Sequence, residues 1–292
     1  MPQFFPRFKW YPAPAKLNLF LHVLGRREDG YHLLQTVFRF IDYGDEIGIT
    51  TRDDGVIRRV DETPGVDAGS DLCLRAARAL RQHASGRIGA AASSLGADIA
   101  LTKRLPIGAG LGGGSSDAAT VLLVLNHEWK LGYTRSELMK LGLGLGADVP
   151  VFVFGKTAFG EGVGERLTAL SAPPAWYLVL TPQVSVSTKE IFASVALTRA
   201  TKALKIPAFL PGLGKNDLQT VATALYPQIG EHLEWLSRHG DARMTGSGAC
   251  VFAGYETEEE ARAVQARLPE AMRGFVARGL DEHPLRNLAG DA

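Results

Sequence analysis

The chain has 292 residues, of which 46% are hydrophobic, and a formal net charge of +1. This length is sufficient for two domains with separate cores. The balance of 32 basic against 31 acidic residues, without a long charged run, argues against a broad nucleic-acid surface. No apolar run approaches the roughly 20 residues that cross a bilayer, and the N-terminus lacks a signal-peptide core. We therefore expect a cytoplasmic protein with no nucleic-acid or membrane partner.

The first elements in chain order are a strand and a helix. Leucine and valine alternate over residues 17–23, which predicts a strand with one apolar face. Lys16, Asn18 and His22 fall on its opposite, polar face. A helix is predicted to begin at Asp71, because an apolar stripe at helical spacing follows that residue.

The rest of the chain alternates between strand and helix signals without an internal repeat. Cys73 and Cys250 lie in apolar periodic stretches, which predicts buried free thiols in a reducing compartment rather than a disulfide or a metal site. We expect, in chain order, a loop over 84–96, a strand over 97–102, a helix from the capping box Thr134–Glu137 to the glycines at 142–146, a connection over 205–215, a strand over 249–255, a helix from the capping box Thr257–Glu260 to Leu268, and a frayed end over 286–292.

The segment 106–119, with the sequence PIGAGLGGGSSDAA, is a glycine-rich turn that leads into a helix. Its five glycines between Gly108 and Gly114 allow backbone N–H groups to approach an anion closely. Ser115, Ser116 and Asp117 are residue types that cap helices. The apolar run that follows is predicted to be helical, and the unpaired N–H donors at the start of a helix favour a phosphate. The order of strand, glycine turn and helix therefore predicts a phosphate-binding loop.

Two common nucleotide motifs match only in part. Residues 108–113 satisfy the dinucleotide pattern GxGxxG, but the acidic residue expected about 20 positions later is missing, and His-Glu-Trp-Lys stands at 127–130 instead. The segment 155–157 (GKT) has the end of a P-loop motif, but Pro150 occupies the position of its first glycine. Both motifs are rejected.

Four blocks of sequence, in order, resemble the GHMP kinase superfamily, and together they extend from about residue 14 to residue 252. The form GGGSSD at 112–117, together with DGYH at 29–32, resembles one branch, which phosphorylates a diphosphocytidyl alcohol of the non-mevalonate isoprenoid pathway. The four blocks are 14–25 (PAKLNLFLHVLG) with 29–32, 106–116 (PIGAGLGGGSS), 146–152 (GADVPVF) and 244–252 (MTGSGACVF).

The mixture of strands, helices and glycine turns indicates an α+β fold. The resemblance implies an N-terminal ATP-binding domain like the second domain of ribosomal protein S5, over residues 1–157. It also implies a ferredoxin-like C-terminal domain over residues 158–292, with the active site in the cleft between the two. The resemblance also implies ATP as the co-substrate, with Mg²⁺ bridging its phosphates. We expect the assembly to be a monomer or a homodimer.

A kinase of this type must hold the polyphosphate, stabilise developing charge and remove a proton from the attacking hydroxyl. The resemblance implies that Asp148 is the general base and that Lys16 holds Asp148 and stabilises the alkoxide. Without the resemblance, the sequence predicts that Asp148 is a helix N-cap, because Pro150 follows two residues later, and that Lys16 is a solvated strand lysine. Ser116 matches a serine near the metal in other members, but no carboxylate partner is evident, so the metal ligands stay open.

The remaining site residues are also implied by the resemblance. Cytosine is expected to stack between Tyr31 and Phe192, His32 to read its edge, and Asn18 and Thr188 to hold other parts of the substrate. Without the resemblance, Tyr31 and His32 are an ordinary start of a strand and Phe192 a core aromatic. ATP is expected to contact Pro106, Ile107, Gly108, Ala109, Gly110, Leu111, Gly112, Gly113, Gly114, Ser115 and Ser116, and the third glycine motif, Gly246, Ser247 and Gly248, is expected to line the site through backbone donors.

Three other functions fit parts of the sequence. A GHMP kinase of the mevalonate or homoserine type keeps the glycine loop but is not expected to carry DGYH at 29–32. A nucleotide or metabolite sensor is expected to lose Lys16 or Asp148, and both are present. A nucleic-acid-binding role, by analogy with the S5-like domain, conflicts with the near-zero net charge and rests on fold analogy alone.

Overall fold

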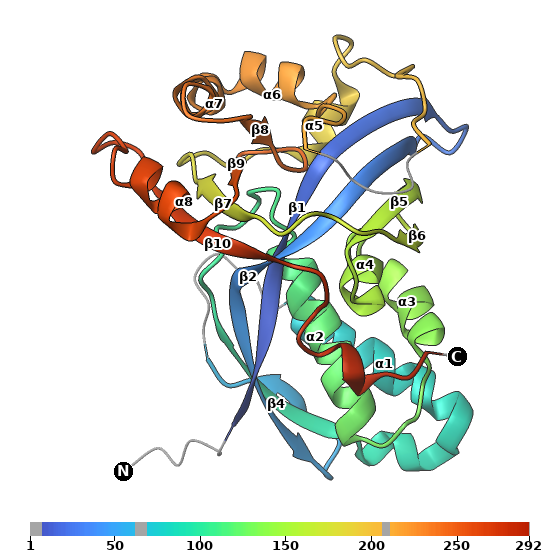
Figure 1. The fold of residues 1–292 in the computed structure, drawn as a ribbon. Coiled ribbons are helices and arrows are strands. Elements are labelled where there is room, and N and C mark those ends of the chain that lie inside the picture. The colour runs from blue at the N-terminus through green and yellow to red at the C-terminus, as the bar shows by residue number, and fades with distance from the viewer. Residues whose placement is uncertain (1–7, 62–68, 206–210, 292) are drawn as a thin grey trace.

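The computed structural model describes residues 8–61, 69–205 and 211–291, and Figure 1 shows the arrangement of their helices and strands. The elements, in chain order, are β1 (Lys9–Arg26), β2 (His32–Arg52), β3 (Ile57–Arg59), α1 (Leu72–Ile88), the 3-10 helix Gly89–Ser94, β4 (Gly96–Thr102), α2 (Gly113–Glu128), α3 (Arg135–Leu143), α4 (Val149–Phe154), β5 (Ala158–Gly162), β6 (Arg166–Ala169), β7 (Trp176–Leu180), α5 (Thr188–Ala193), α6 (Gln219–Leu225), α7 (Pro227–Ser237), β8 (Arg243–Met244), β9 (Val251–Tyr255), α8 (Glu258–Gln265), β10 (Gly274–Leu280) and the 3-10 helix Arg286–Leu288.

Strand β2 is the axis of the structure. Within the described ranges ten strands form one sheet, and β2 pairs with β1, β4, β5 and β10 at different points along its 21 residues. Strands β1 and β2 make a long antiparallel hairpin that runs the length of the molecule (Figure 1). The sheet continues through β10 to β7, β9 and β8, so the hairpin joins the N-terminal and C-terminal halves.

The helices cover the sheet in two groups (Figure 1). Helices α1 to α4 lie against the N-terminal half, and α6, α7 and α8 lie against the C-terminal half. Helix α2 is the central one, because every residue from Ser116 to Asn126 is buried. Such all-round burial explains why its sequence lacks a polar face.

Among the described residues three apolar clusters form the core, and the glycine-rich loop lies where the two halves of the molecule meet. One cluster joins α1, α2 and α4 to the N-terminal strands, and a second joins α6 and α7 to β7 and β9. The third lies between them and includes Leu111 of the glycine loop beside Leu17 of β1, Val179 of β7 and Phe252 of β9. The loop is therefore held from both sides.

Most of the predicted elements are confirmed. The α+β fold is present, the strands expected at 17–23 and 97–102 are parts of β1 and β4, and the strand expected at 249–255 is β9. Asp71 caps α1 by accepting hydrogen bonds from the N–H groups of Cys73 and Leu74. Both capping boxes are formed, at Thr134 and at Thr257. Cys73 and Cys250 are buried free thiols.

Three predictions about local structure are wrong. Residues 84–96 are not a loop, because α1 extends to Ile88 and a 3-10 helix follows. Alanine is abundant there, and its helix propensity outweighs the glycines and serines. Helix α2 begins at Gly113 with Gly112 as N-cap, and no side chain caps it. Ser115 and Ser116 therefore lie inside its first turn.

The chain end is the third correction. It is tied down as far as Asp291 rather than frayed: the buried guanidinium of Arg135 donates to the carbonyls of Arg286 and Ala289, each at 2.6 Å, and pairs with Asp291 at 2.6 Å. Long-range pairing of this kind leaves no local sequence signal. Parts of the predicted connection at 205–215 and residue 292 lie outside the described residues.

The predicted domain boundary between residues 157 and 158 stays a prediction. It falls at the start of β5, a strand that pairs with β2 of the N-terminal half.

Candidate functional site

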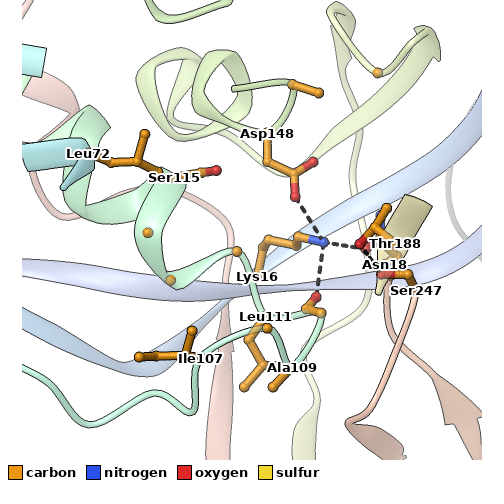
Figure 2. Close-up of a pocket in the computed structure, with 18 of the residues that line it drawn as sticks. Lys16, Asn18, Leu72, Ile107, Ala109, Leu111, Ser115, Asp148, Thr188 and Ser247 are labelled. Carbon is orange, nitrogen blue, oxygen red and sulfur yellow. Dashed lines mark hydrogen bonds and ion pairs between the residues drawn. The ribbon is translucent and has the colours of Figure 1, made fainter. Parts of the chain in front are cut away.

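A cavity of about 560 Å³ lies between the glycine-rich loop and the two halves of the molecule. This volume falls within the range of small-molecule sites. Its walls come from β1, α2, the start of α4, α5 and the loop before β9 (Figure 2). The lining residues include Lys16, Asn18, Pro106 through Ser115, Asp148, Thr188, Phe192, Gly246 and Ser247, and also Asp71, Leu72, Cys73, Lys103 and Asp117.

Glycine is required in the loop for both backbone conformation and space. Gly108, Gly110 and Gly112 have φ of +68°, +78° and +72°, in the left-handed region that favours glycine. A Cβ on Gly110 would lie 2.2 Å from the carbonyl oxygen of Thr245. Thr245 belongs to the loop that precedes β9. The glycine-rich loop is also hydrogen-bonded to that loop, since Cys250 N–H donates to the carbonyl of Ala109 at 3.1 Å. The two glycine motifs therefore form one packed unit.

The two serines at the start of α2 have different environments. Ser116 is fully buried, and its hydroxyl donates to the carbonyl of Pro14 at 2.7 Å. Ser115 lines the cavity, and its hydroxyl points into it (Figure 2). The first N–H groups of α2 have no partner within the helix, so they are available to an anion in the cavity.

Lys16 is the buried cation of the site. Its side chain is 3% exposed, and its ammonium contacts three acceptors: Asn18 Oδ1 at 2.5 Å, the Gly110 carbonyl at 3.0 Å and Asp148 Oδ2 at 3.3 Å (Figure 2). An ammonium has three donors, so its hydrogen-bonding capacity is matched. β1 sets this position through pairing of Lys16 with Phe40 of β2. The solvated-lysine alternative is therefore wrong.

Asp148 stands at the N-cap position of α4 but makes no capping hydrogen bond. Its carboxylate faces Lys16 instead and remains 35% exposed to the cavity. Pro150, in the first turn of the helix, has no N–H that would need a cap, and the carboxylate of Asp148 is free for another contact. One oxygen pairs with Lys16, and the side chain still reaches the cavity.

A second charged cluster lies behind the glycine loop. Lys103 contacts Asp45 at 2.6 Å and Asp117 at 2.9 Å, and Asp45 also accepts from the N–H groups of Arg104 and Leu105. Burial raises the pKa of Asp117 to about 7; Asp45 adds to the shift and Lys103 opposes it. Burial by itself would lower the pKa of Lys103, but Asp117 and Asp45 raise it overall. Sequence analysis missed this cluster, although Asp117 lies in the GGGSSD motif.

On the opposite wall, α5 meets the loop that precedes β9. The hydroxyls of Thr188 and Ser247 are 2.7 Å apart, and both side chains line the cavity (Figure 2). Gly246 also lines the cavity, and its carbonyl accepts from Asn216 Nδ2 at 2.8 Å. Gly248 lies outside the cavity lining, and its N–H donates to the carbonyl of Thr245 at 3.1 Å.

Asn18 is held from both sides. Its side-chain amide donates to Thr36 Oγ1 at 2.8 Å while its oxygen accepts from Lys16. With 2% exposure, its main contact in this structure is to Lys16 rather than to the open cavity.

The three predicted base-binding residues occupy different places. Phe192 lines the cavity, whereas Tyr31 is 63% exposed and lies outside its lining. His32 is buried, and its ring stacks on Phe192 with centroids 4.8 Å apart. A base between two rings needs them about 7 Å apart, twice the usual contact distance, so no base fits between His32 and Phe192. Their proposed roles stay predictions.

Comparisons with known proteins assign the family. The model of the GHMP kinases N terminal domain matches residues 71–156, and that of the GHMP kinases C terminal domain matches residues 177–274. The chain is 60% identical over 275 residues to the 4-diphosphocytidyl-2-C-methyl-D-erythritol kinase of Thiobacillus denitrificans, covering 94% of this chain and 96% of that protein. It is 57% identical to the kinase of the same name from Nitrosospira multiformis, covering 95% of this chain and 93% of that protein.

Solved structures agree with these matches. A crystal structure of 4-(cytidine 5'-diphospho)-2C-methyl-D-erythritol kinase superposes with a TM-score of 0.76 at 33% identity, covering 93% of this chain and 99% of that chain. The mevalonate kinase of Methanococcus jannaschii has a TM-score of 0.65 at 17% identity, covering 94% of this chain and 100% of that chain, and this likeness supports the fold alone.

The fold, the paired glycine loops and the buried lysine facing an aspartate together define a small-molecule kinase of the GHMP class. Within that class, the chain belongs to the 4-diphosphocytidyl-2-C-methyl-D-erythritol kinase family.

Proposed function

We infer that this protein transfers the γ-phosphoryl group of ATP to the 2-hydroxyl of 4-diphosphocytidyl-2-C-methyl-D-erythritol, giving the 2-phosphate and ADP in the non-mevalonate route to isopentenyl diphosphate. The family assignment supports the substrates. The observation that carries the chemistry is the contact of Lys16 Nζ with Asp148 Oδ2 at 3.3 Å, at the wall of the cavity that the glycine loop also lines.

In this proposal Asp148 takes the proton of the attacking hydroxyl. Its carboxylate is a suitable base because one side is held by Lys16 and the rest is exposed to the cavity. Lys16 orients the carboxylate and stabilises negative charge that develops on the substrate oxygen. Because Asn18 and the Gly110 carbonyl fix the ammonium, this stabilisation needs little rearrangement during the reaction.

The glycine loop and the N-terminus of α2 are proposed to hold the polyphosphate. Their backbone N–H groups supply donors without side-chain bulk, and the helix dipole adds positive potential. The apolar side chains of Leu72 and Ile107, further along the same cavity, offer a surface for the adenine ring.

The residues of the cavity fit a magnesium ion that is held largely by phosphate and water. Within the described ranges, no group of three or more His, Cys, Asp or Glu side chains could hold a metal. The Ser115 hydroxyl and the Asp148 carboxylate are two of the side-chain oxygen ligands that line the cavity, and Mg²⁺ commonly binds through few protein ligands. When bound, the ion would neutralise charge on the transferred phosphoryl group. The hydroxyl of Ser116, which the resemblance places near the metal, donates instead to the carbonyl of Pro14.

ADP release with ATP, Mg²⁺ and 4-diphosphocytidyl-2-C-methyl-D-erythritol is the direct test, with mevalonate, homoserine and galactose as comparison substrates. Turnover with the cytidine substrate alone supports the proposal. Turnover with another alcohol instead would keep the kinase and overturn the substrate, and nucleotide binding without turnover would favour a sensor.

Asp148→Asn is the paired variant for this experiment. Loss of general-base assistance should lower kcat by roughly 10²–10⁴ while ATP binding is kept. Unchanged kcat would contradict the assignment of the base.

The cellular location, the partners and the assembly of the protein are also proposals. No helix in the described residues has both the length and the apolar character needed to cross a membrane. We propose a cytoplasmic location, which the free thiols of Cys73 and Cys250 support, with no nucleic-acid partner and a monomer or homodimer as the assembly.

A further inference from the structure

Asn216 holds the loop that precedes β9 from the buried side of that loop. Its side-chain amide donates to two carbonyls of the loop, those of Met244 at 2.7 Å and Gly246 at 2.8 Å. Its side-chain oxygen accepts from the N–H of Leu218 at 2.9 Å. Asn216 is 5% exposed and lies outside the cavity lining. The side chain therefore acts on backbone groups rather than on a ligand.

Strand β1 fixes the position of Asn216. Leu21 N–H donates to the carbonyl of Lys215 at 2.9 Å, and the carbonyl of Leu21 accepts from the N–H of Asp217 at 2.8 Å. The chain on both sides of Asn216 therefore lies along β1. The carboxylate of Asp217 also accepts from the N–H of Val23 at 2.8 Å. The strand that carries the proposed reacting residues of the site thus positions Asn216 as well.

The contact between Asn216 and Gly246 determines which way one peptide group of the loop faces. The N–H of Gly248 donates to the carbonyl of Thr245 at 3.1 Å, which closes a four-residue turn. The peptide at the centre of this turn joins Gly246 to Ser247. A trans peptide is planar, so its N–H points opposite to its C=O. Because the Gly246 carbonyl faces the buried Asn216, the N–H of Ser247 faces the other way, toward the cavity that Ser247 lines (Figure 2).

Asn216 also opposes rotation of this peptide. Gly246 has φ of +56°, and Lys130 is the only non-glycine residue in the described ranges with a positive φ, so φ of Ser247 is negative. These signs are those of a type II′ turn, which rotation of the central peptide converts to type I′. The rotation would turn the Gly246 carbonyl toward the cavity and take the acceptor away from Asn216. In the observed orientation the N–H of Ser247 has no partner within the described parts of the chain, so it is available to a ligand.

We propose that Asn216 is a positioning residue that keeps the N–H of Ser247 turned into the cavity, where this N–H donates to a phosphate oxygen of a bound reactant. A hydrogen bond to an anionic oxygen is stronger than one between neutral groups. The inference rests on the proposed function, because it assumes that phosphorylated reactants occupy the cavity. Both reactants, ATP and the diphosphocytidyl alcohol, carry such oxygens, and separate binding measurements distinguish them.

Calorimetry with Asn216→Leu measures the phosphate contribution to binding. The variant removes both amide donors and keeps a side chain of similar size. It should weaken binding of either β,γ-imido-ATP or cytidine 5′-diphosphate by at least about tenfold, the effect of one lost charge-assisted hydrogen bond. Adenosine and cytidine, which lack phosphate, should bind within about threefold of wild type. A loss for the ATP analogue assigns the oxygen to ATP, and a loss for the cytidine nucleotide assigns it to the alcohol substrate.

Asn126→Leu is the matched control. Asn126 is also a buried asparagine, 3% exposed, and its side chain donates to the carbonyl of Tyr133 and accepts from the N–H of Tyr133, each at 3.0 Å. It lies outside the cavity lining. Both variants should lose stability in urea unfolding, but only Asn216→Leu should lose affinity for a phosphorylated ligand. Equal affinity losses in the two variants, or equal losses for nucleosides and nucleotides, would overturn the positioning role.

A second pair of variants acts on the N–H itself. Ser247→Pro removes this N–H, and the fixed negative φ of proline suits the turn. Ser247→Ala is the reference, because it also lacks the hydroxyl but keeps the N–H. Ser247→Pro should bind the same phosphorylated ligand at least about tenfold more weakly than Ser247→Ala, and adding Asn216→Leu should cause little further loss, since the donor is already absent. Equal binding by the two Ser247 variants would contradict the proposal.

These measurements do not require turnover, so they separate this inference from the proposed function. If Asn216→Leu binds both phosphorylated ligands as wild type does, the inference is wrong, whether or not the protein phosphorylates the cytidine alcohol. A phosphate-specific loss in Asn216→Leu, together with a wild type that does not phosphorylate the cytidine alcohol, supports the role of Asn216 and contradicts the proposed reaction.

Discussion

At the scale of single residues, the site depends on charges that are buried together. Lys16 has three acceptors and little exposure, so its charge is tolerated because Asp148, Asn18 and the Gly110 carbonyl surround it. Asp148 in turn keeps its orientation because Lys16 holds it. The two residues should therefore act as a unit rather than as independent contributors.

A double-mutant cycle tests this coupling. Lys16→Met and Asp148→Asn should each lower kcat by roughly 10²–10⁴, and the double variant should lose little more than the worse single variant, because residues that act as a unit give non-additive effects. Rates from steady-state turnover, with ATP affinity from calorimetry as the folding control, provide the measurement. Fully multiplicative losses would show that the two residues act separately.

The acid Asp117 should make stability depend on pH. Its pKa is raised to about 7 in the folded state, above its ordinary value near 4, so the folded state binds the proton more tightly than the unfolded chain. Its contribution to stability should then fall as pH rises from about 4 to about 7. Urea unfolding at pH 5 and pH 8 should show that Asp117→Asn, compared with wild type at each pH, is relatively more stable at pH 8. An equal difference at both pH values would contradict the shifted pKa.

At the scale of elements, the two glycine loops are packed against each other so closely that side chains are excluded. Gly110 has both a left-handed φ and a Cβ position 2.2 Å from the Thr245 carbonyl oxygen. Gly132 has a similar φ of +66° but no atom within 4 Å of its Cβ position. Substitutions at Gly110 and Gly132 can therefore be compared to separate the cost of backbone strain from that of steric overlap.

Gly110→Ala should therefore cost more than Gly132→Ala. Both variants pay the left-handed strain of about 1–2 kcal/mol, and Gly110→Ala should lose about 1–3 kcal/mol more through overlap. It should also raise the KM for ATP, because the loop must shift. The free energy of unfolding from urea titration and the KM for ATP measure these effects. Equal losses in the two variants would mean that the contact between the loops relaxes without cost.

At the scale of the whole molecule, the last residues return from β10 to the helices of the N-terminal half. Arg135, at the start of α3, is 5% exposed and donates to the carbonyls of Val153, Arg286 and Ala289. Val153 belongs to α4, the helix that begins next to Asp148. The chain end, α3 and the helix that carries the proposed base are thus tied together through one side chain.

Arg135→Ala should lower the free energy of unfolding by several kcal/mol, because each buried carbonyl left without a donor costs about 1–3 kcal/mol. Arg262→Ala is the control, since Arg262 forms an exposed pair with Glu258 one helical turn away, a type of contact worth about 0.5 kcal/mol or less. Urea unfolding of both variants, with limited proteolysis of the chain end, checks the prediction. A loss in Arg135→Ala as small as that in the control would show that the chain end docks without it.

Much of this molecule follows from its sequence, because the features concerned are local. Alternation set β1, side-chain caps set α1, α3 and α8, and the run of glycines marked the phosphate loop, since each depends on residues close in the chain. Motif resemblance added Lys16 and Asp148.

Only the tertiary structure decided three contacts of the site. Asp148 leaves its helix uncapped and faces Lys16. The hydroxyl of Ser116 donates to the carbonyl of Pro14, whereas Ser115 reaches the cavity. Lys103, Asp45 and Asp117 meet behind the glycine loop. These contacts join residues far apart in the chain, and their partners are fixed by strand register and helix packing, which no single segment encodes.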